Sequence, residues 1–160
     1  MYSAIKNIVT NINKLLGYII GLFLAVMVVA IFYQVFSRFV VGQSTAWSEE
    51  LARLLMIYVV LFGAAIALRK GELLSVDILP EILKSTGKKK LSIIVNLFSA
   101  FFSIILVYFG FILALKVNVQ TLPGLKISMF WMYLALPLGG LFMLINSIFN
   151  LWAPTQEVEK

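Results

Sequence analysis

The stretch that decides the fold is residues 47–77, which read WSEELARLLMIYVVLFGAAIALRKGELLSVD. Its charged residues bracket a long apolar run. They are Glu49, Glu50 and Arg53 before the run, and Arg69, Lys70, Glu72 and Asp77 after it. At about 1.5 Å per residue, a helix over 46–68 is roughly 35 Å long and crosses a hydrocarbon core of about 30 Å. The stretch therefore predicts a membrane-spanning helix with a charged group of residues at each end.

The composition extends this prediction to the whole chain. Of the 160 residues, 62% are hydrophobic and only 12% are charged, and the mean hydropathy is +1.02. Soluble domains carry about 25% charged residues, so this composition predicts one integral membrane domain over 1–160. The sequence has no Cys and no His, the side chains that hold haem and zinc. We therefore expect no cofactor, no metal site and no enzymatic activity.

Three further apolar segments predict spans over 15–37, 91–115 and 127–152. The fold class is thus all-α, with four transmembrane helices. Between the second and third spans, the apolar segment 73–83 is too short to cross a bilayer. We expect this segment to lie along the membrane surface. Pro123 and Gly124 mark the turn before the fourth span.

Small residues predict where helices approach one another. Glycines in membrane helices allow close contact between backbones. The packing candidates are Gly17 and Gly21 in the first span, Gly63 in the second, Gly110 in the third and Pro137 in the fourth. We interpret Pro137 as a packing kink rather than a moving hinge. Asn146 and Asn150, four residues apart, are candidates for hydrogen bonds between helices.

The distribution of basic residues predicts the orientation. With four spans, nine basic residues lie on the side of the two termini and four lie on the other side. The positive-inside rule then places both termini in the cytoplasm. Residues 88–90, all lysine, are expected to contact anionic membrane lipids. They do not indicate nucleic acid binding, because no folded basic domain or aromatic platform accompanies them.

The end of the second span that faces outside holds the first candidate site. Trp47 is interpreted as an interfacial anchor, with direct contact to a partner protein as the alternative. Glu49 and Glu50 lie four and three residues before Arg53, so both carboxylates can reach its guanidinium. We interpret these three residues as a local ion-pair cluster. The alternative is that one of them contacts a partner subunit.

The other end of the span holds the second candidate site. Arg69 and Lys70 are interpreted as cytoplasmic anchors of the helix. Asp77 is expected to pair with one of these cations or with Lys84. No span carries a charge at its middle, where a self-sufficient ion-coupled transporter needs an ionisable group. That argues against the alternative function considered, a small homodimeric proton-coupled transporter.

The motifs together resemble those of a known family. Residues 47–53 (WSEELAR), 62–65 (FGAA), 69–71 (RKG), 76–77 (VD) and 133–137 (YLALP) are similar to the small membrane subunit of tripartite ATP-independent periplasmic (TRAP) transporters. The resemblance covers roughly residues 34–145. One departure is Leu73, where the family often has histidine.

The resemblance implies a function and two protein partners. It implies an accessory, scaffolding subunit in the bacterial inner membrane, bound to a large multi-span permease subunit. That large subunit would hold the substrate and sodium sites. A periplasmic substrate-binding protein would deliver an organic acid of the sialic acid or C4-dicarboxylate class.

Overall fold

The computed structural model describes residues 2–42, 45–71 and 85–152 of the chain. Its elements are α1 (Tyr2–Phe36), the π-helix η1 (Ser37–Val41), α2 (Ala46–Lys70), α4 (Ser85–Lys116), α5 (Phe130–Tyr133) and α6 (Ala135–Trp152). Four helical segments are long and apolar enough to cross a membrane. They are Ser3–Val40, Ala46–Lys70, Leu91–Lys116 and Phe130–Trp152. The prediction of an all-α membrane protein with four spans is confirmed.

Two helices begin earlier than the apolar pattern indicated. α1 begins at Tyr2 rather than at residue 15, and α4 begins at Ser85 rather than at residue 91. The polar residues before each apolar run contain no proline, so the helix continues through them. With 35 residues, α1 is about 52 Å long and extends beyond a hydrocarbon core of about 30 Å. The predicted surface segment 73–83, which includes Asp77, lies outside the described residues.

The fourth span differs from the prediction in its start and its continuity. Its helix starts at Phe130 rather than at residue 127, because Ser128 lies in the preceding loop and its Oγ accepts a 3.1 Å hydrogen bond from the Phe130 N–H. The helix is then divided at Leu134 into α5 and α6. Pro137 has no N–H to donate to the carbonyl of Tyr133, four residues earlier. The loss of that bond accounts for the division.

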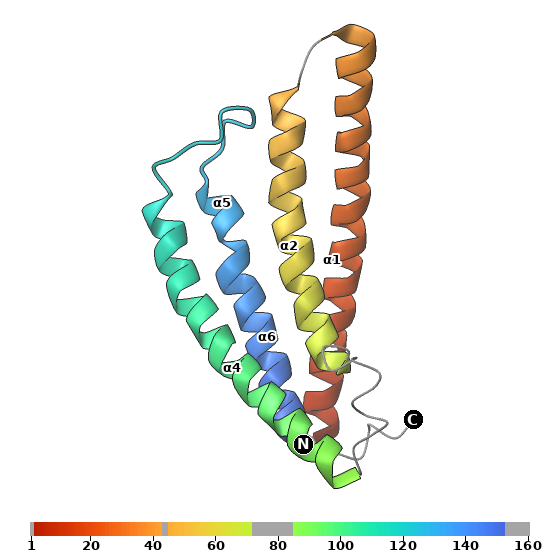
Figure 1. Cartoon of the computed structure of the whole chain (residues 1–160), viewed down its shortest axis with the longest axis vertical. Helices are drawn as coiled ribbons and strands as arrows, with labels where there is room; N and C mark the ends of the chain where they lie inside the picture. The colour runs from red at the N-terminus through yellow and green to blue at the C-terminus, as the bar shows by residue number, and fades with distance from the viewer. Residues whose placement is uncertain (1, 43–44, 72–84, 153–160) are drawn as a thin grey trace.

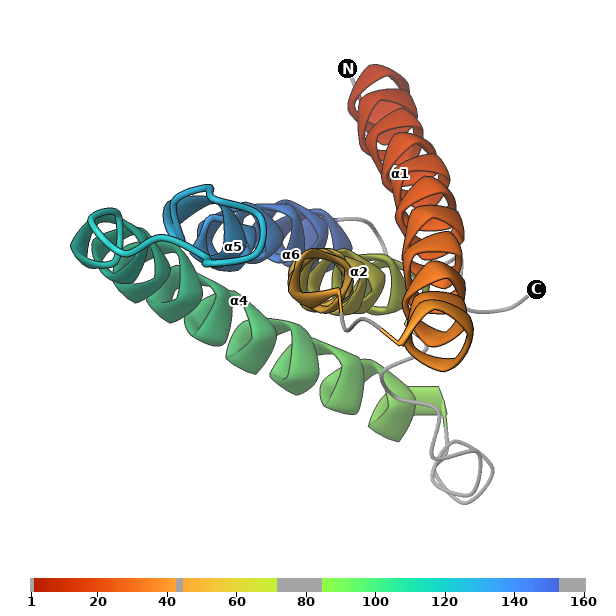
Figure 2. The same cartoon turned by 90° about the horizontal axis from the view of Figure 1, so that it is seen from above.

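The helices form a row with α2 and α6 in the middle (Figures 1 and 2). α1 packs against α2, α2 against α6, and α6 against α4. The first turns of α1 and the last turns of α6 lie at one end of the molecule, which is called the terminal end below (Figure 1). The opposite end, where α2 begins and α4 leads into α5 through residues 117–129, is called the loop end.

Glycines bring α6 close to both of its neighbours. A Cβ atom added at Gly139 would lie 2.6 Å from the Cβ of Leu61 on α2. One added at Gly110 on α4 would lie 2.8 Å from the Cβ of Leu136 and 3.1 Å from the Cδ of Pro137. Such distances leave no room for a methyl group, so these glycines set the spacing between the helices.

The other candidate glycines do not contact a second helix of this chain. A Cβ atom added at Gly17, Gly21 or Gly63 would meet no heavy atom within 4 Å, apart from the backbone of its own helix. Gly17 and Gly21 are exposed on α1. The small residues of α1 therefore leave a shallow surface that no described helix of this chain covers.

Aromatic rings and small apolar side chains fill the contact between the middle helices. Edge-to-face ring pairs run from Phe23 to Tyr58, from Tyr58 to Phe62 and from Phe62 to Phe142, with centroids 5.5–5.9 Å apart. These rings join α1, α2 and α6. Closer to the terminal end, a cluster of buried residues follows, formed by Ala65, Leu68 and Met143. Each aromatic pair contributes about 0.5–1.5 kcal/mol beyond area burial.

Candidate functional site

At the loop end, the carboxylate of Glu50 holds the loop between α4 and α5. Both of its oxygens accept hydrogen bonds from the backbone N–H of Gly124, at 3.0 and 2.9 Å. Oε2 also accepts a 2.8 Å bond from the N–H of Leu125. The prediction that Glu50 belongs to an ion-pair cluster with Arg53 is therefore wrong. Glu50 is directed to backbone donors because the loop folds back over the first turns of α2.

Gly124 is the residue that permits this contact. A Cβ atom at this position would lie 2.7 Å from the backbone N of Trp47, 2.8 Å from the backbone carbon of Ala46 and 2.9 Å from Oε2 of Glu50. Two of these neighbours are backbone atoms, which cannot move aside as a flexible side chain can. In the sequence, Gly124 indicated only a turn. No local pattern identified the helix against which the turn packs.

Glu49 makes the ion pair that Glu50 does not make. Its Oε1 lies 2.9 Å from Nη2 of Arg53, and the two side chains are 60% and 62% exposed. An exposed pair four residues apart on a helix contributes about 0.3–0.5 kcal/mol. Glu49 and Glu50 are thus adjacent acids in different environments.

Trp47 lies where α1 and α2 meet at the loop end. Its ring centroid is 5.5 Å from that of Tyr33 on α1, and the residue is 39% exposed. Its assignment as an interfacial anchor remains a prediction. Thr45 occupies the N-cap position of α2, and its hydroxyl pairs with the hydroxyl of Ser48 at 2.8 Å rather than with a backbone N–H.

At the terminal end, two asparagines join the first and last helices. Asn13 of α1 donates to Oδ1 of Asn146 on α6 at 2.8 Å, and Asn146 donates back to Oδ1 of Asn13 at 2.9 Å. Asn146 also donates to the carbonyl of Ala65 on α2 at 2.7 Å. Three helices thus meet at one buried amide. The expected role of Asn146 in hydrogen bonds between helices is confirmed, whereas Asn13 lies before the predicted first span of 15–37.

One turn further along α6, Asn150 extends the same network. Its Nδ2 donates to the carbonyl of Leu68 at 2.8 Å and to Oδ1 of Asn96 on α4 at 3.3 Å. Its Oδ1 accepts a 3.0 Å bond from Nη1 of Arg69. The guanidinium carbon of Arg69 lies 4.4 Å from the ring centroid of Phe149. Arg69 is thereby held against α6.

The buried polar side chains are used in hydrogen bonds within the protein. Among the described residues, every buried side-chain nitrogen or oxygen has a hydrogen-bond partner. In 2–42, 45–71 and 85–152, no group of three or more His, Cys, Asp and Glu residues lies close enough to hold a metal ion. The network consists of neutral amides and carbonyls, with one cation at its edge. Hydrogen bonds of this kind fix the positions of membrane helices relative to one another.

The fold and these sites define a class: a small multi-pass membrane protein whose buried polar residues join its helices. The chain belongs to a family within this class. The model of the family "Tripartite ATP-independent periplasmic transporters, DctQ component" matches residues 27–157. This is a multi-pass protein of the bacterial inner membrane, and it is a transporter subunit rather than an enzyme.

Individual relatives agree with this assignment. The chain is 30% identical to the sialic acid TRAP transporter small permease protein SiaQ of Vibrio cholerae, covering 92% of this chain and 85% of that protein. It is 29% identical to the ectoine TRAP transporter small permease protein TeaB of Halomonas elongata, covering 88% and 74%. It is also 32% identical to part of the sialic acid TRAP transporter permease protein SiaT of Haemophilus influenzae, covering 86% of this chain and 22% of that protein.

Proposed function

We propose that this chain is a static scaffold for a large multi-span permease subunit, which performs the transport. The single observation that carries the proposal is the position of the charges. In the described spans, charged side chains lie in the terminal turns or beside the apolar stretch, as Lys14, Arg53 and Arg69 do. A subunit that coupled ions to substrate would need an ionisable group near the bilayer centre.

The exposed surface of the outer helices, α1 and α4, favours the presence of a large membrane partner. Only 11% of the most apolar window of Ser3–Val40 and 17% of that of Leu91–Lys116 are buried within this chain. The exposed glycines of α1 permit close approach of another helix. The relative SiaT, in which a similar segment is part of a much longer permease chain, favours a partner that is itself a permease.

The proposal also covers the transported solute and the ion whose gradient drives its uptake. A periplasmic substrate-binding protein would deliver a small carboxylate-bearing solute, and the sodium sites would lie in the large subunit. The names of the relatives include sialic acid, ectoine and C4-dicarboxylate as transported solutes. Sialic acid and the C4-dicarboxylates remain the proposed classes for this chain. In this arrangement both termini lie in the cytoplasm, as the excess of basic residues at the terminal end suggests.

Reconstitution tests the proposal. The chain is purified alone and together with the large permease subunit of its transporter, and each sample is placed in liposomes with a substrate-binding protein. Uptake of labelled sialic acid or of a C4-dicarboxylate is expected only with both subunits present and only with an inward sodium gradient. Uptake by this chain alone, driven by a proton gradient, would support the small homodimeric transporter and would contradict the scaffold.

A further inference from the structure

A pocket of about 320 Å³ opens between α1 and α2 at the terminal end. The residues that line it are Thr10, Asn13, Lys14, Ile66, Arg69 and Lys70. Among these lining residues, Lys14 of α1 and Arg69 of α2 are cations contributed by two different helices. We propose that this pocket binds the phosphate headgroup of an anionic phospholipid from the surrounding membrane.

The cations on α1 and α2 lie at the same depth in the membrane. On α1, Lys14 immediately precedes Leu15, where the long apolar stretch of the span begins. On α2, Arg69 immediately follows Leu68, where the apolar run ends. The pocket therefore lies where two independent boundaries between polar and apolar sequence meet. In a membrane protein, that boundary is the level of the lipid headgroups.

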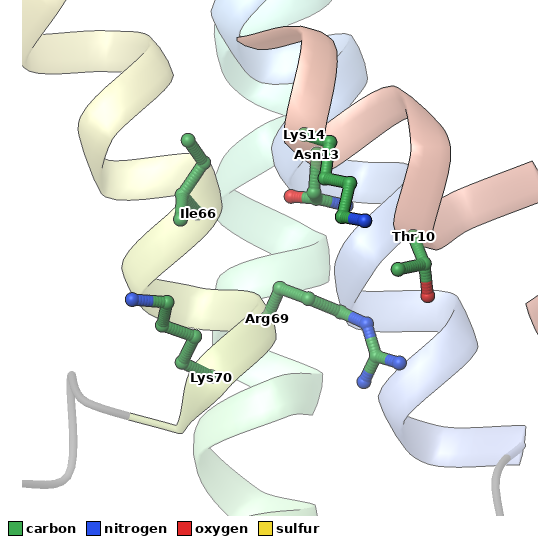
Figure 3. A pocket seen from close by; sticks show the side chains of 6 residues that line it. All are labelled: Thr10, Asn13, Lys14, Ile66, Arg69 and Lys70. Carbon is green, nitrogen blue, oxygen red and sulfur yellow. The ribbon is translucent and has the colours of Figure 1, made fainter. Parts of the chain in front are cut away.

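The guanidinium of Arg69, which lines the pocket, is held against α6. The 3.0 Å bond to Asn150 and the stacking on Phe149 hold it in place. Figure 3 shows it extending from α2 to the side of the pocket where Thr10 lies, with Lys14 above it and Lys70 extending the opposite way. The bond to Asn150 uses one of the five N–H donors of a guanidinium. Guanidinium and ammonium groups are the usual donors to phosphate.

The surroundings of the pocket suit a lipid better than a soluble anion. Tyr18 follows Lys14 by one helical turn on the same face of α1 and is 77% exposed, and Leu15 is 60% exposed. Acyl chains attached to a phosphate in the pocket would run along this apolar surface. A free phosphate would gain nothing from it.

Native mass spectrometry of the full-length chain in detergent tests this inference. Dioleoylphosphatidylglycerol and dioleoylphosphatidylcholine are added at equal concentration, and the bound fraction of each lipid is measured. The wild-type chain is expected to bind the anionic lipid preferentially. Lys14→Gln is expected to lower its affinity about fivefold, since each cation near an anionic surface contributes about 1 kcal/mol. The matched control is Lys116→Gln, which removes a cation from the last turn of α4 at the loop end.

Three results would overturn the proposal. The first is equal binding of the two lipids by the wild-type chain. The second is equal binding of the anionic lipid by the Lys14→Gln and Lys116→Gln variants. The third is displacement of the lipid by millimolar inorganic phosphate, which would identify the pocket as a site for a soluble anion. Arg69→Gln also breaks the bond to Asn150, so Lys14, which is exposed, is the residue on which the test depends.

Discussion

The carboxylate of Glu50 and the backbone N–H of Gly124 form hydrogen bonds of 3.0 and 2.9 Å across a separation of 74 residues. Glu49, the adjacent acid, instead pairs with Arg53 on the exposed surface of the same helix. The two glutamates differ in environment and not in chemistry. They therefore form a matched pair for mutagenesis.

Glu50→Gln is expected to destabilise the protein, because it removes the charge that receives three backbone hydrogen bonds. Bonds to charged groups contribute about 1.5–3 kcal/mol, and a loss of this size is expected in the free energy of unfolding. Titration of the purified chain with sodium dodecyl sulfate in mixed micelles measures it. Glu49→Gln, the control, is expected to change stability by less than about 1 kcal/mol. Equal losses for both variants would contradict the different roles assigned to them.

The same pair tests the alternative that this end contacts the binding protein. If Glu50 only holds the loop, uptake by its variant should fall in proportion to the loss of folded complex. Lost uptake with an unchanged unfolding midpoint and normal assembly would instead indicate docking. Uptake measurements and co-purification with the large subunit separate these outcomes.

Gly139→Ala is expected to destabilise the contact between α2 and α6. The added methyl group would lie 2.6 Å from the Cβ of Leu61, and overpacking of this kind costs about 1–3 kcal/mol. Gly63→Ala, on the same helix as Leu61, is the control, because its added Cβ meets no atom of another helix within 4 Å. Alanine there should be neutral or slightly stabilising. A more harmful effect at Gly63 than at Gly139 in the isolated chain would refute the helix packing described.

Asn13 and Asn146 are expected to be energetically coupled. Their reciprocal bonds have lengths of 2.8 and 2.9 Å, and hydrogen bonds between membrane helices average about 0.6 kcal/mol, with a maximum near 1.7. Asn13→Ala should cost about this much. Asn146→Ala should cost more because it also leaves the carbonyl of Ala65 without its 2.7 Å donor. In a double-mutant cycle, the double variant should cost less than the sum of the single variants, and strict additivity would contradict the contact.

The orientation can be measured directly, because the chain has no cysteine. Ser3→Cys places one thiol in the first turn of α1, and Val119→Cys places one in the loop after α4, where the residue is 88% exposed. In intact spheroplasts, a membrane-impermeant maleimide is expected to label only the second variant. Labelling of Ser3→Cys from outside would reverse the orientation proposed from the positive-inside rule.

The apolar runs of the sequence predicted the spans because the bilayer core excludes unpaired backbone and charged groups. They predicted the start of α2 at Ala46 but not where α1 and α4 begin. Asn13 lies outside the apolar stretch and yet inside α1, since nothing before it breaks the helix. Hydropathy reports which residues lie in lipid, and helical structure continues past that limit.

Only part of the candidate site could be predicted from the sequence, for a related reason. Spacing of three and four residues predicts neighbours on one helix, so the pair of Glu49 and Arg53 was accessible from sequence. The same rule assigned Glu50 wrongly, because a partner 74 residues away competes for its carboxylate. Gly110 and Gly17 look alike in sequence, and only the arrangement of helices distinguishes a covered glycine from an open one.

The contacts at the two ends of the molecule also constrain its biogenesis. The first two helices emerge from the ribosome long before the partners of Glu50 and Asn13, which follow at Gly124 and Asn146. Until the last quarter of the chain has been inserted, the hydrogen bonds at the two ends of the molecule cannot form. In the nascent protein, Glu50 and Asn13 therefore lack these two partners. A truncation before α6 would leave Asn13 and the carbonyl of Ala65 without Asn146, and membrane quality-control proteases should recognise the product.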